Sequence, residues 1–203
     1  MLVQWYAGEQ QGCTLADILL GKVNPSGKLN VSFPRSTGNT PCFYNHFVTD
    51  REESFDQPGT PEEPKGHYIF DKPEPLWNFG HGKSYTTFDY VDCALSDTLL
   101  VASDTLKVSV TIKNTGRRDG KEVVQLYVRD KVSTVATPIQ QLKAFQKVLI
   151  KPGESQCVEL SLPIAELALY NAKMEEVVEP GDFEIQIGAA SDDIRFKKTI
   201  TIN

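Results

Sequence analysis

Residues 105–128 read TLKVSVTIKNTGRRDGKEVVQLYV, and this stretch decides the fold. Apolar and polar residues alternate over 106–113, which is the pattern of a half-buried β-strand. Asn114-Thr115-Gly116 predicts a turn. Residues 123–128 then predict a second strand, because neighbouring side chains along it point to opposite faces.

Alternating segments continue to the end of the chain, with turn signals about every ten residues. The turns are expected at 151–154 (KPGE) and 180–182 (PGD), and the further strands at 145–150, 158–162, 183–187 and 194–202. One short helix is expected at 164–170, with Pro163 in its first turn. About seven strands spaced in this way predict a mainly β protein with an immunoglobulin-like sandwich.

The chain changes character near residue 85. Residues 1–84 hold eight of the twelve prolines, both tryptophans and all three histidines, whereas 85–203 consist of alternating strands. We therefore expect two parts, 1–84 and 85–203. Residues 50–64 (DREESFDQPGTPEEP) have almost nothing to bury and are expected to form a solvated loop.

The first part contains the pattern of one strand–helix–strand unit. Residues 2–6 form an apolar run typical of a buried strand. Apolar residues at helical spacing in 15–19 predict a helix that stops near Gly21. Residues 29–33 alternate again as a strand, which Pro34 ends. A single unit of this kind cannot cover both faces of its strands.

Composition excludes several classes of protein. The 203 residues are 40% hydrophobic and 24% charged, with a net charge of −6, which disfavours sequence-independent binding of nucleic acid. No run approaches the ~20 apolar residues of a membrane-spanning helix. The four cysteines are far apart, and we predict four free thiols. The first residues, MLVQWY, do not have the pattern of a secretory leader.

Candidate catalytic acids are easy to find among the 27 acidic residues, but their context is poor. Glycosidic hydrolysis usually needs two carboxylates about 5–9 Å apart in a walled site. The pairs Glu52-Glu53 and Glu62-Glu63 lie in the expected solvated loop, so we interpret them as surface acids.

Other motifs for chemistry are incomplete. His46, His67 and His81 have no metal-ligand spacing, so we expect no metal site and no cofactor. Gly82-Lys83-Ser84 resembles the end of a phosphate-binding loop but lacks the earlier glycine. Ser32 and Ser84 lack the G-x-S-x-G setting of a nucleophile.

The aromatic residues have two interpretations. They could form a platform for stacking on a sugar, or they could pack one part of the chain on the other, and we favour packing. The residues are Trp5, Tyr6, Trp77, Phe79 and Tyr85. Arg117-Arg118 is expected to be a solvated hairpin tip.

Long ordered stretches of the chain resemble glycoside hydrolase family 3. The first set is 5–12 (WYAGEQQG), 15–21 (LADILLG), 24–29 (NPSGKL), 32–34 (SFP), 66–71 (GHYIFD) and 75–88 (PLWNFGHGKSYTTF). The second set is 114–116 (NTG), Gly120, 122–128 (EVVQLYV), Leu142, Phe145, 152–154 (PGE) and Gly181. Within 66–71, His67 and Ile69 depart from the pattern of the family.

The resemblance implies the C-terminal portion of a retaining β-glucosidase or β-xylosidase. Residues 1–84 then correspond to the end of an α/β sandwich domain plus a linker, and 85–203 to a fibronectin type III-like domain. In the family the nucleophile and the acid/base lie upstream, in a barrel and in an earlier part of the sandwich domain. The resemblance therefore implies no catalytic residue here and a structural role that braces those domains, which are the expected partners in cis or in trans.

Two alternatives remain open. The first is a non-catalytic carbohydrate-binding module with an exposed aromatic row, for which Tyr127 is the main outward candidate. The second is an accessory chain that completes a split β-glycosidase. A β-glycoside is a possible ligand, and substrate-binding residues are unknown. Members of the family are often periplasmic or secreted.

Overall fold

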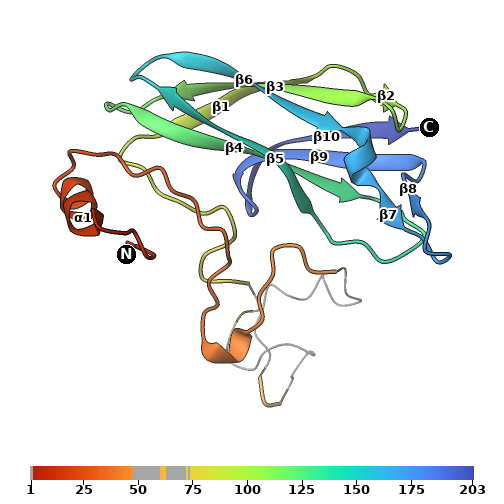
Figure 1. Ribbon diagram of the computed structural model, residues 1–203, viewed down its shortest axis with the longest axis horizontal. Helices are drawn as coiled ribbons and strands as arrows, with labels where there is room; N and C mark the ends of the chain where they lie inside the picture. Colours follow the sequence, from red (N-terminus) through yellow and green to blue (C-terminus); the bar gives the residue numbers. More distant parts are fainter. Residues whose placement is uncertain (1, 48–59, 63–71, 73) are drawn as a thin grey trace.

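The computed structural model describes residues 2–47, 60–62, 72 and 74–203, and its main feature is a sandwich of two β-sheets (Figure 1). The first sheet has the strand order β1-β3-β6 and the second the order β2-β10-β9-β4-β5. Neighbouring strands are antiparallel except β10 and β2, which run parallel. This is the immunoglobulin and fibronectin type III-like fold expected from the sequence.

Seven strands of eight or more residues lie between residues 85 and 203, all of which the structure describes. They are β1 (Phe88–Leu95), β3 (Thr105–Asn114), β4 (Gly120–Asp130), β5 (Gln141–Ile150), β6 (Ser155–Pro163), β9 (Gly181–Ala190) and β10 (Asp193–Ile202). Three strands have only two residues: β2 (Leu99–Leu100), β7 (Leu169–Tyr170) and β8 (Glu176–Val177).

The core lies between the two sheets. On β3, the four residues Leu106, Val108, Val110 and Ile112 have no exposed surface, as the alternation in the sequence predicts. They face Val124, Leu126, Val128, Ile185 and Ile187 of the other sheet within one continuous apolar cluster. Burial of this surface is the main favourable term for the sandwich.

The expected helix at 164–170 is shorter than predicted. A 3₁₀ helix, η3, covers Ile164–Leu167 after Pro163, but Leu169 and Tyr170 belong to β7 and pair with β8. Backbone pairing with β8 therefore overrides the local preference for a longer helix.

The described part of residues 1–84, here called the N-terminal segment, contains helix α1 (Gln11–Leu19) and the 3₁₀ helix η1 (Thr37–Asn39). Helix α1 confirms the sequence prediction, and Gly21 follows it with φ of 70°. No residue of α1 is buried. In Figure 1 the helix, drawn in red, stands apart from the strands.

The two strands predicted in the N-terminal segment are not formed. Described residues 2–6 have no regular structure, and Tyr6 is fully exposed. Residues 29–33 contain a bend at residues 30 and 31 and make only scattered backbone bonds to 76–81, such as Phe33 N–H to Trp77 O at 2.8 Å. Their alternation is real, yet no strand of the described residues lies beside them to form a ladder.

Glycines allow the N-terminal segment to lie close to itself and to the sandwich. A Cβ atom on Gly82 would lie 2.4 Å from the carbonyl oxygen of Gly27, and one on Gly120 would lie 2.4 Å from Thr86 Cγ2. Gly82 therefore serves backbone packing, which gives the lone Gly-Lys-Ser sequence a structural explanation.

We predict that hydrogen exchange separates the two parts of the chain. Amides of α1 should exchange at least about 100-fold faster than those of β3 and β9, because α1 has no buried side chain and the strands form the core. Exchange measured by mass spectrometry on peptic peptides tests this. Equal protection of α1 and β3 would contradict it.

Candidate functional site: the contact between the N-terminal segment and the sandwich

An aromatic stack joins the N-terminal segment to the outer face of the five-stranded sheet. The rings of Tyr44 and Phe79 are stacked with centroids 4.2 Å apart, and Tyr44 meets Tyr127 edge-on at 5.9 Å. Tyr127 has no exposed surface and donates from its hydroxyl to Gln125 Oε1 at 2.6 Å. The alternative of a carbohydrate-binding module, for which Tyr127 is the main candidate, therefore loses support: the residue points outward from the sheet, but Tyr44 covers it.

Polar contacts continue this interface along β4 and the β9–β10 turn. Gln125 Nε2 donates to Ala189 O at 2.6 Å and to Gly80 O at 3.4 Å. Ser191 N–H donates to Phe79 O at 3.0 Å. Burial raises the pKa of the Tyr127 hydroxyl, which therefore stays protonated and able to donate.

Asn24 fastens the turn of the N-terminal segment to the start of the sandwich. Its Oδ1 accepts from Ser84 Oγ at 2.9 Å and from Tyr85 N–H at 2.8 Å, while Nδ2 donates to Asp119 O at 2.8 Å. One side chain thus bridges three backbone regions, and the Ser84 hydroxyl is engaged in this bridge.

Arg117 and Arg118 are exposed, as expected, but they do not form a hairpin tip, because the strands β3 and β4 on either side of them belong to different sheets. Arg118 also makes contacts. Its Nη1 donates to Gly21 O at 2.7 Å, and its guanidinium lies 6.0 Å from the ring centroid of Tyr85. The Tyr85 hydroxyl donates to Ile18 O at 2.9 Å. The β3–β4 loop therefore contacts the backbone just after the C-terminal end of α1.

The five aromatic candidates from the sequence do not form one platform. Phe33 links Trp5 and Trp77, with ring centroids 6.1 and 5.7 Å away, whereas Phe79 belongs to the Tyr44 stack. The arrangement supports packing within the chain over a continuous sugar-binding row.

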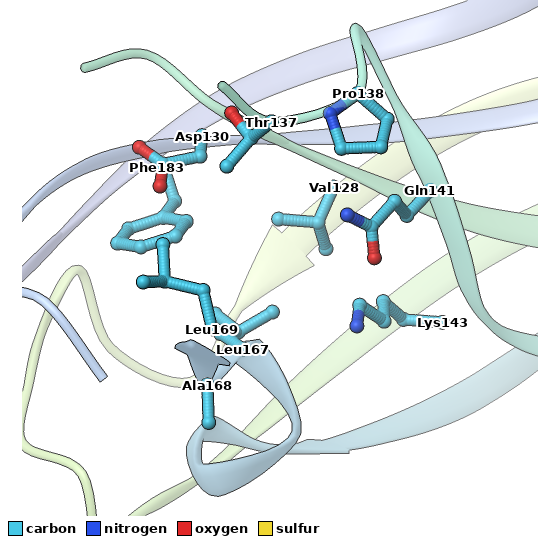
Figure 2. Close-up of a pocket in the computed structure, with 10 residues that line it drawn as sticks. All are labelled: Val128, Asp130, Thr137, Pro138, Gln141, Lys143, Leu167, Ala168, Leu169 and Phe183. Atoms are coloured by element: carbon cyan, nitrogen blue, oxygen red, sulfur yellow. The ribbon is translucent and has the colours of Figure 1, made fainter. Parts of the chain in front are cut away.

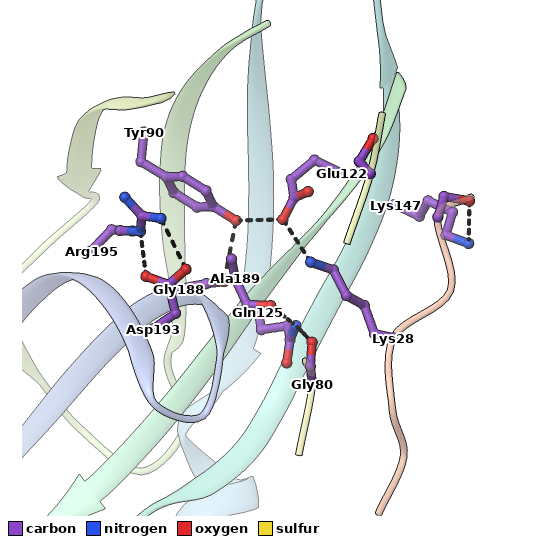
Figure 3. Close-up of polar contacts among 12 residues, drawn as sticks. Lys28, Gly80, Tyr90, Glu122, Gln125, Lys147, Gly188, Ala189, Asp193 and Arg195 are labelled. Carbon is purple, nitrogen blue, oxygen red and sulfur yellow. Dashed lines mark hydrogen bonds and ion pairs between the residues drawn. The ribbon is translucent and has the colours of Figure 1, made fainter. Parts of the chain in front are cut away.

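A buried polar cluster lies near the same interface (Figure 3). Lys28 Nζ is 3.2 Å from Glu122 Oε1, and the Tyr90 hydroxyl lies 3.3 Å from the same oxygen. Arg195 pairs with Asp193 beside it, with Nη2 2.9 Å from Oδ2. Burial is the main cause that raises the pKa of Glu122, and Lys28 opposes it.

Of the four candidate acids, the structure describes Glu62 alone, which does not line either cleft described below. Glu62 is exposed, while Glu52, Glu53 and Glu63 lie outside the described residues. Two adjoining clefts, of about 40 and 270 Å³, contain a single carboxylate, Asp130, among the described residues of their walls.

Figure 2 shows the smaller cleft, with Asp130 and Lys143 at opposite ends in this view. Lys143 Nζ donates to Glu166 O at 2.7 Å, and burial lowers its pKa. Burial also raises the pKa of Asp130. One carboxylate and one amine do not provide the acid and the nucleophile that glycosidic hydrolysis requires.

The remaining chemical motifs have structural surroundings. His46 contacts its own neighbour, with Nδ1 3.0 Å from Phe47 O, and His67 lies outside the described residues. Ser32 Oγ is buried without a hydrogen-bond partner among the described residues and so has no base beside it there. Within the part of the chain that the structure describes, no group of three or more His, Cys, Asp or Glu residues could hold a metal ion. All four cysteines are free, which confirms the prediction.

Two family models match the sequence of this chain. Residues 1–85 match the glycosyl hydrolase family 3 C-terminal domain, and residues 122–191 match a fibronectin type III-like domain. The chain corresponds to the C-terminal portion of glycoside hydrolase family 3. This confirms the resemblance inferred from the motifs.

Similar proteins include enzymes from several bacteria. A periplasmic β-glucosidase of Salmonella typhimurium is 40% identical over 94% of this chain and 25% of its own length. A β-xylosidase of Formosa agariphila is 41% identical over 96% of this chain and 26% of its own length. The chain therefore spans about a quarter of the curated relatives that it matches.

Solved structures of family members have the same fold. A β-glucosidase from Listeria innocua in complex with glucose superposes with a TM-score of 0.84 at 38% identity, covering 98% of this chain and 27% of that one. β-Glucosidase 3B from Thermotoga neapolitana gives a TM-score of 0.76 at 37% identity, with shares of 97% and 27%. Both the N-terminal segment and the sandwich are thus features of the family.

We predict that Tyr44→Ala loosens the N-terminal segment. Loss of the stacked ring should lower the free energy of unfolding by about 2 kcal/mol, because it uncovers Tyr127 and removes two ring contacts. Phe43→Ala, at an exposed neighbouring ring, should change it by less than about 0.5 kcal/mol. Urea unfolding followed by tryptophan fluorescence measures both, since Trp5 and Trp77 lie in this segment. Equal effects of the two variants would contradict the assignment.

Proposed function

We propose that this chain serves as the C-terminal structural part of a family 3 β-glycosidase and has no glycosidase activity alone. One observation carries the proposal. Nearly the whole chain matches a β-glucosidase and a β-xylosidase, and the match spans about a quarter of the length of each. Its contribution to hydrolysis of O-glycosyl bonds is then the support of the domains that perform the chemistry.

The surroundings of the candidate groups support this role. Asp130 is the single carboxylate among the described residues of the two clefts, and neither cleft contains the facing acids of a glycosidase there. The proposal assigns no catalytic residue, no metal ligand and no cofactor site to the chain, and it names no substrate-binding residue.

The partners in this proposal are the N-terminal barrel and the remaining part of the sandwich domain, in cis or in trans. Large apolar side chains of the N-terminal segment support this choice, because they are exposed where a domain contact would bury them. Trp5 is 58% exposed, Leu19 68% and Leu20 71%. Leu19 ends helix α1 and Leu20 follows it directly, so this end of the helix is the main candidate for the contact.

The division of the chain at residues 84 and 85 is part of the same proposal. The first strand of the sandwich begins at Phe88, and the bridge made by Asn24 lies at the junction. For location, we propose the periplasm or the exterior of the cell, on the basis of the relative named periplasmic. Within the described residues no helix is both long and apolar enough to cross a membrane.

A carbohydrate-binding module receives less support. Its main aromatic candidate, Tyr127, is covered by Tyr44 and occupied by a hydrogen bond to Gln125. An accessory chain of a split enzyme would use the same exposed side chains at the end of α1, so it is one form of the proposed function.

We predict that the purified chain does not hydrolyse aryl β-glucosides or aryl β-xylosides. A chimera of the Salmonella β-glucosidase in which this chain replaces the matching quarter should be active, because the chain supplies the scaffold. Leu20→Lys in the chimera should reduce activity at least about tenfold through loss of the domain contact, whereas Val132→Lys, on an exposed sandwich loop, should not. Turnover by the chain alone above the buffer rate would contradict the proposal.

A further inference from the structure

Glu122 is a carboxylate that faces the inside of the sandwich. Glu122 lies two and four residues before Val124 and Leu126 of the core, so its side chain points to the same face of β4 as theirs. It is only 5% exposed. Tyr90, from β1 of the opposite sheet, approaches it from across the space between the sheets. A charged group in this position is unfavourable unless it is paired.

The positive charge comes from outside the sandwich. Lys28 belongs to the N-terminal segment, and its ammonium lies 3.2 Å from Glu122 Oε1, with side-chain exposures of 14% and 7% for the pair. A Cβ atom on Gly82 would lie 2.9 Å from Lys28 Cδ, so the stem of the lysine is closely packed. Figure 3 shows the lysine reaching the carboxylate from the opposite side to Tyr90.

We propose that the Lys28–Glu122 ion pair is a pH-sensitive coupling between docking of the N-terminal segment and stability of the sandwich. When the segment is docked, Lys28 neutralises Glu122. When it leaves, the carboxylate has to take up a proton or become solvated. The sandwich is then fully stable only together with the segment that precedes it.

Other charged groups around Glu122 do not replace Lys28. From β10, Asp193 raises the pKa of Glu122 further, and Arg195 is engaged with Asp193, its Nε 2.6 Å from Oδ1. From β1, Tyr90 is a neutral donor, because burial raises the pKa of its hydroxyl. Among the ion pairs of the described residues, Glu122 is joined to Lys28 alone.

Groups near Lys28 in the N-terminal segment also bear on the pH dependence. The pKa of His81 is lowered, mainly by burial. Charged groups also affect this pKa: Lys28 and Lys83 from the same segment, and Asp192 and Asp193 from the β9–β10 region. His81 therefore takes up a proton at a lower pH than an ordinary histidine. Lys28→Met also removes the Lys28 charge that lowers the pKa of His81. This change occurs in both the wild-type and Glu122→Gln backgrounds, so the double-mutant cycle cancels it.

The sign of the pH dependence follows from the raised pKa of Glu122. A carboxyl with a raised pKa in the docked state stabilises that state fully at low pH, and the stabilisation is lost as pH rises through the docked pKa. Lys28 opposes this rise, so without Lys28 the pKa of Glu122 rises further. Lys28→Met should therefore be most harmful at high pH and least harmful at low pH.

The test is a double-mutant cycle on the full chain with Lys28→Met and Glu122→Gln. Fluorescence of Trp5 and Trp77 reports the N-terminal segment, and far-ultraviolet circular dichroism reports the sandwich, which contains no tryptophan. At about pH 8, Lys28→Met should raise the unfolding equilibrium constant at least about tenfold. At about pH 5 the increase should be smaller, about threefold or less, because the raised pKa of Glu122 means that a larger fraction of this carboxyl is protonated as the pH falls.

The control variants separate charge pairing from general damage. Lys22→Met removes an exposed ion pair with Asp17, 3.4 Å long, and should have little effect at either pH. In the Glu122→Gln background, Lys28→Met should raise the unfolding equilibrium constant by less than about threefold at about pH 8. An effect of Lys28→Met that is equal in the wild-type and Glu122→Gln backgrounds, or no larger than that of Lys22→Met, would overturn the proposal.

If Lys28→Met alone does not fold, two further variants decide the matter. Lys28→Arg retains the charge, and the double variant removes both charges, so each should fold and give a cooperative transition. If either Lys28→Arg or the double variant failed to fold, the proposal would be overturned, because the lysine would then be needed for its shape alone.

Discussion

The outer face of the five-stranded sheet has to be covered, and this requirement holds the N-terminal segment in place. Gln125 and Tyr127 project from that face, and both are buried. Buried polar groups need partners, and the sandwich itself supplies Ala189 O for Gln125 and Gln125 Oε1 for the Tyr127 hydroxyl. The N-terminal segment adds the carbonyl of Gly80 and covers the Tyr127 ring with Tyr44. The segment therefore completes the sandwich, and the two parts share one set of buried contacts.

This dependence on neighbouring chain suits a structural role in a larger enzyme. One side of the N-terminal segment contacts the sandwich through Asn24, Tyr44 and Phe79, while the end of α1 leaves Leu19 and Leu20 exposed. The segment can thus transmit the position of the sandwich to whatever covers the helix. In the proposed function the covering surface belongs to the domains that contain the catalytic residues, and the rigidity of the contact helps to keep those domains in place.

The sandwich could be predicted from the sequence because burial of alternate residues leaves a direct pattern, as on β3. Whether an outward-pointing side chain is exposed or covered could not be predicted in this way. Alternation shows which face of the sheet Tyr127 occupies, but it does not show that Tyr44 covers the residue. The same limit applies to residues 2–6 and 29–33, whose apolar pattern predicts strands although the described residues contain no ladder for them. Lys28 and Glu122 lie in motifs recognised in the sequence, but 94 residues separate them, so their pairing follows only from the fold.

The most direct test of the covered sheet is a nuclear Overhauser measurement on the isotope-labelled chain in solution. We expect cross-peaks between the ring protons of Tyr44 and those of Phe79 and Tyr127, whose centroids lie 4.2 and 5.9 Å away. The Tyr127 hydroxyl proton should also exchange slowly with water. Absence of these cross-peaks, together with a solvent-exposed Tyr127 ring, would contradict the account.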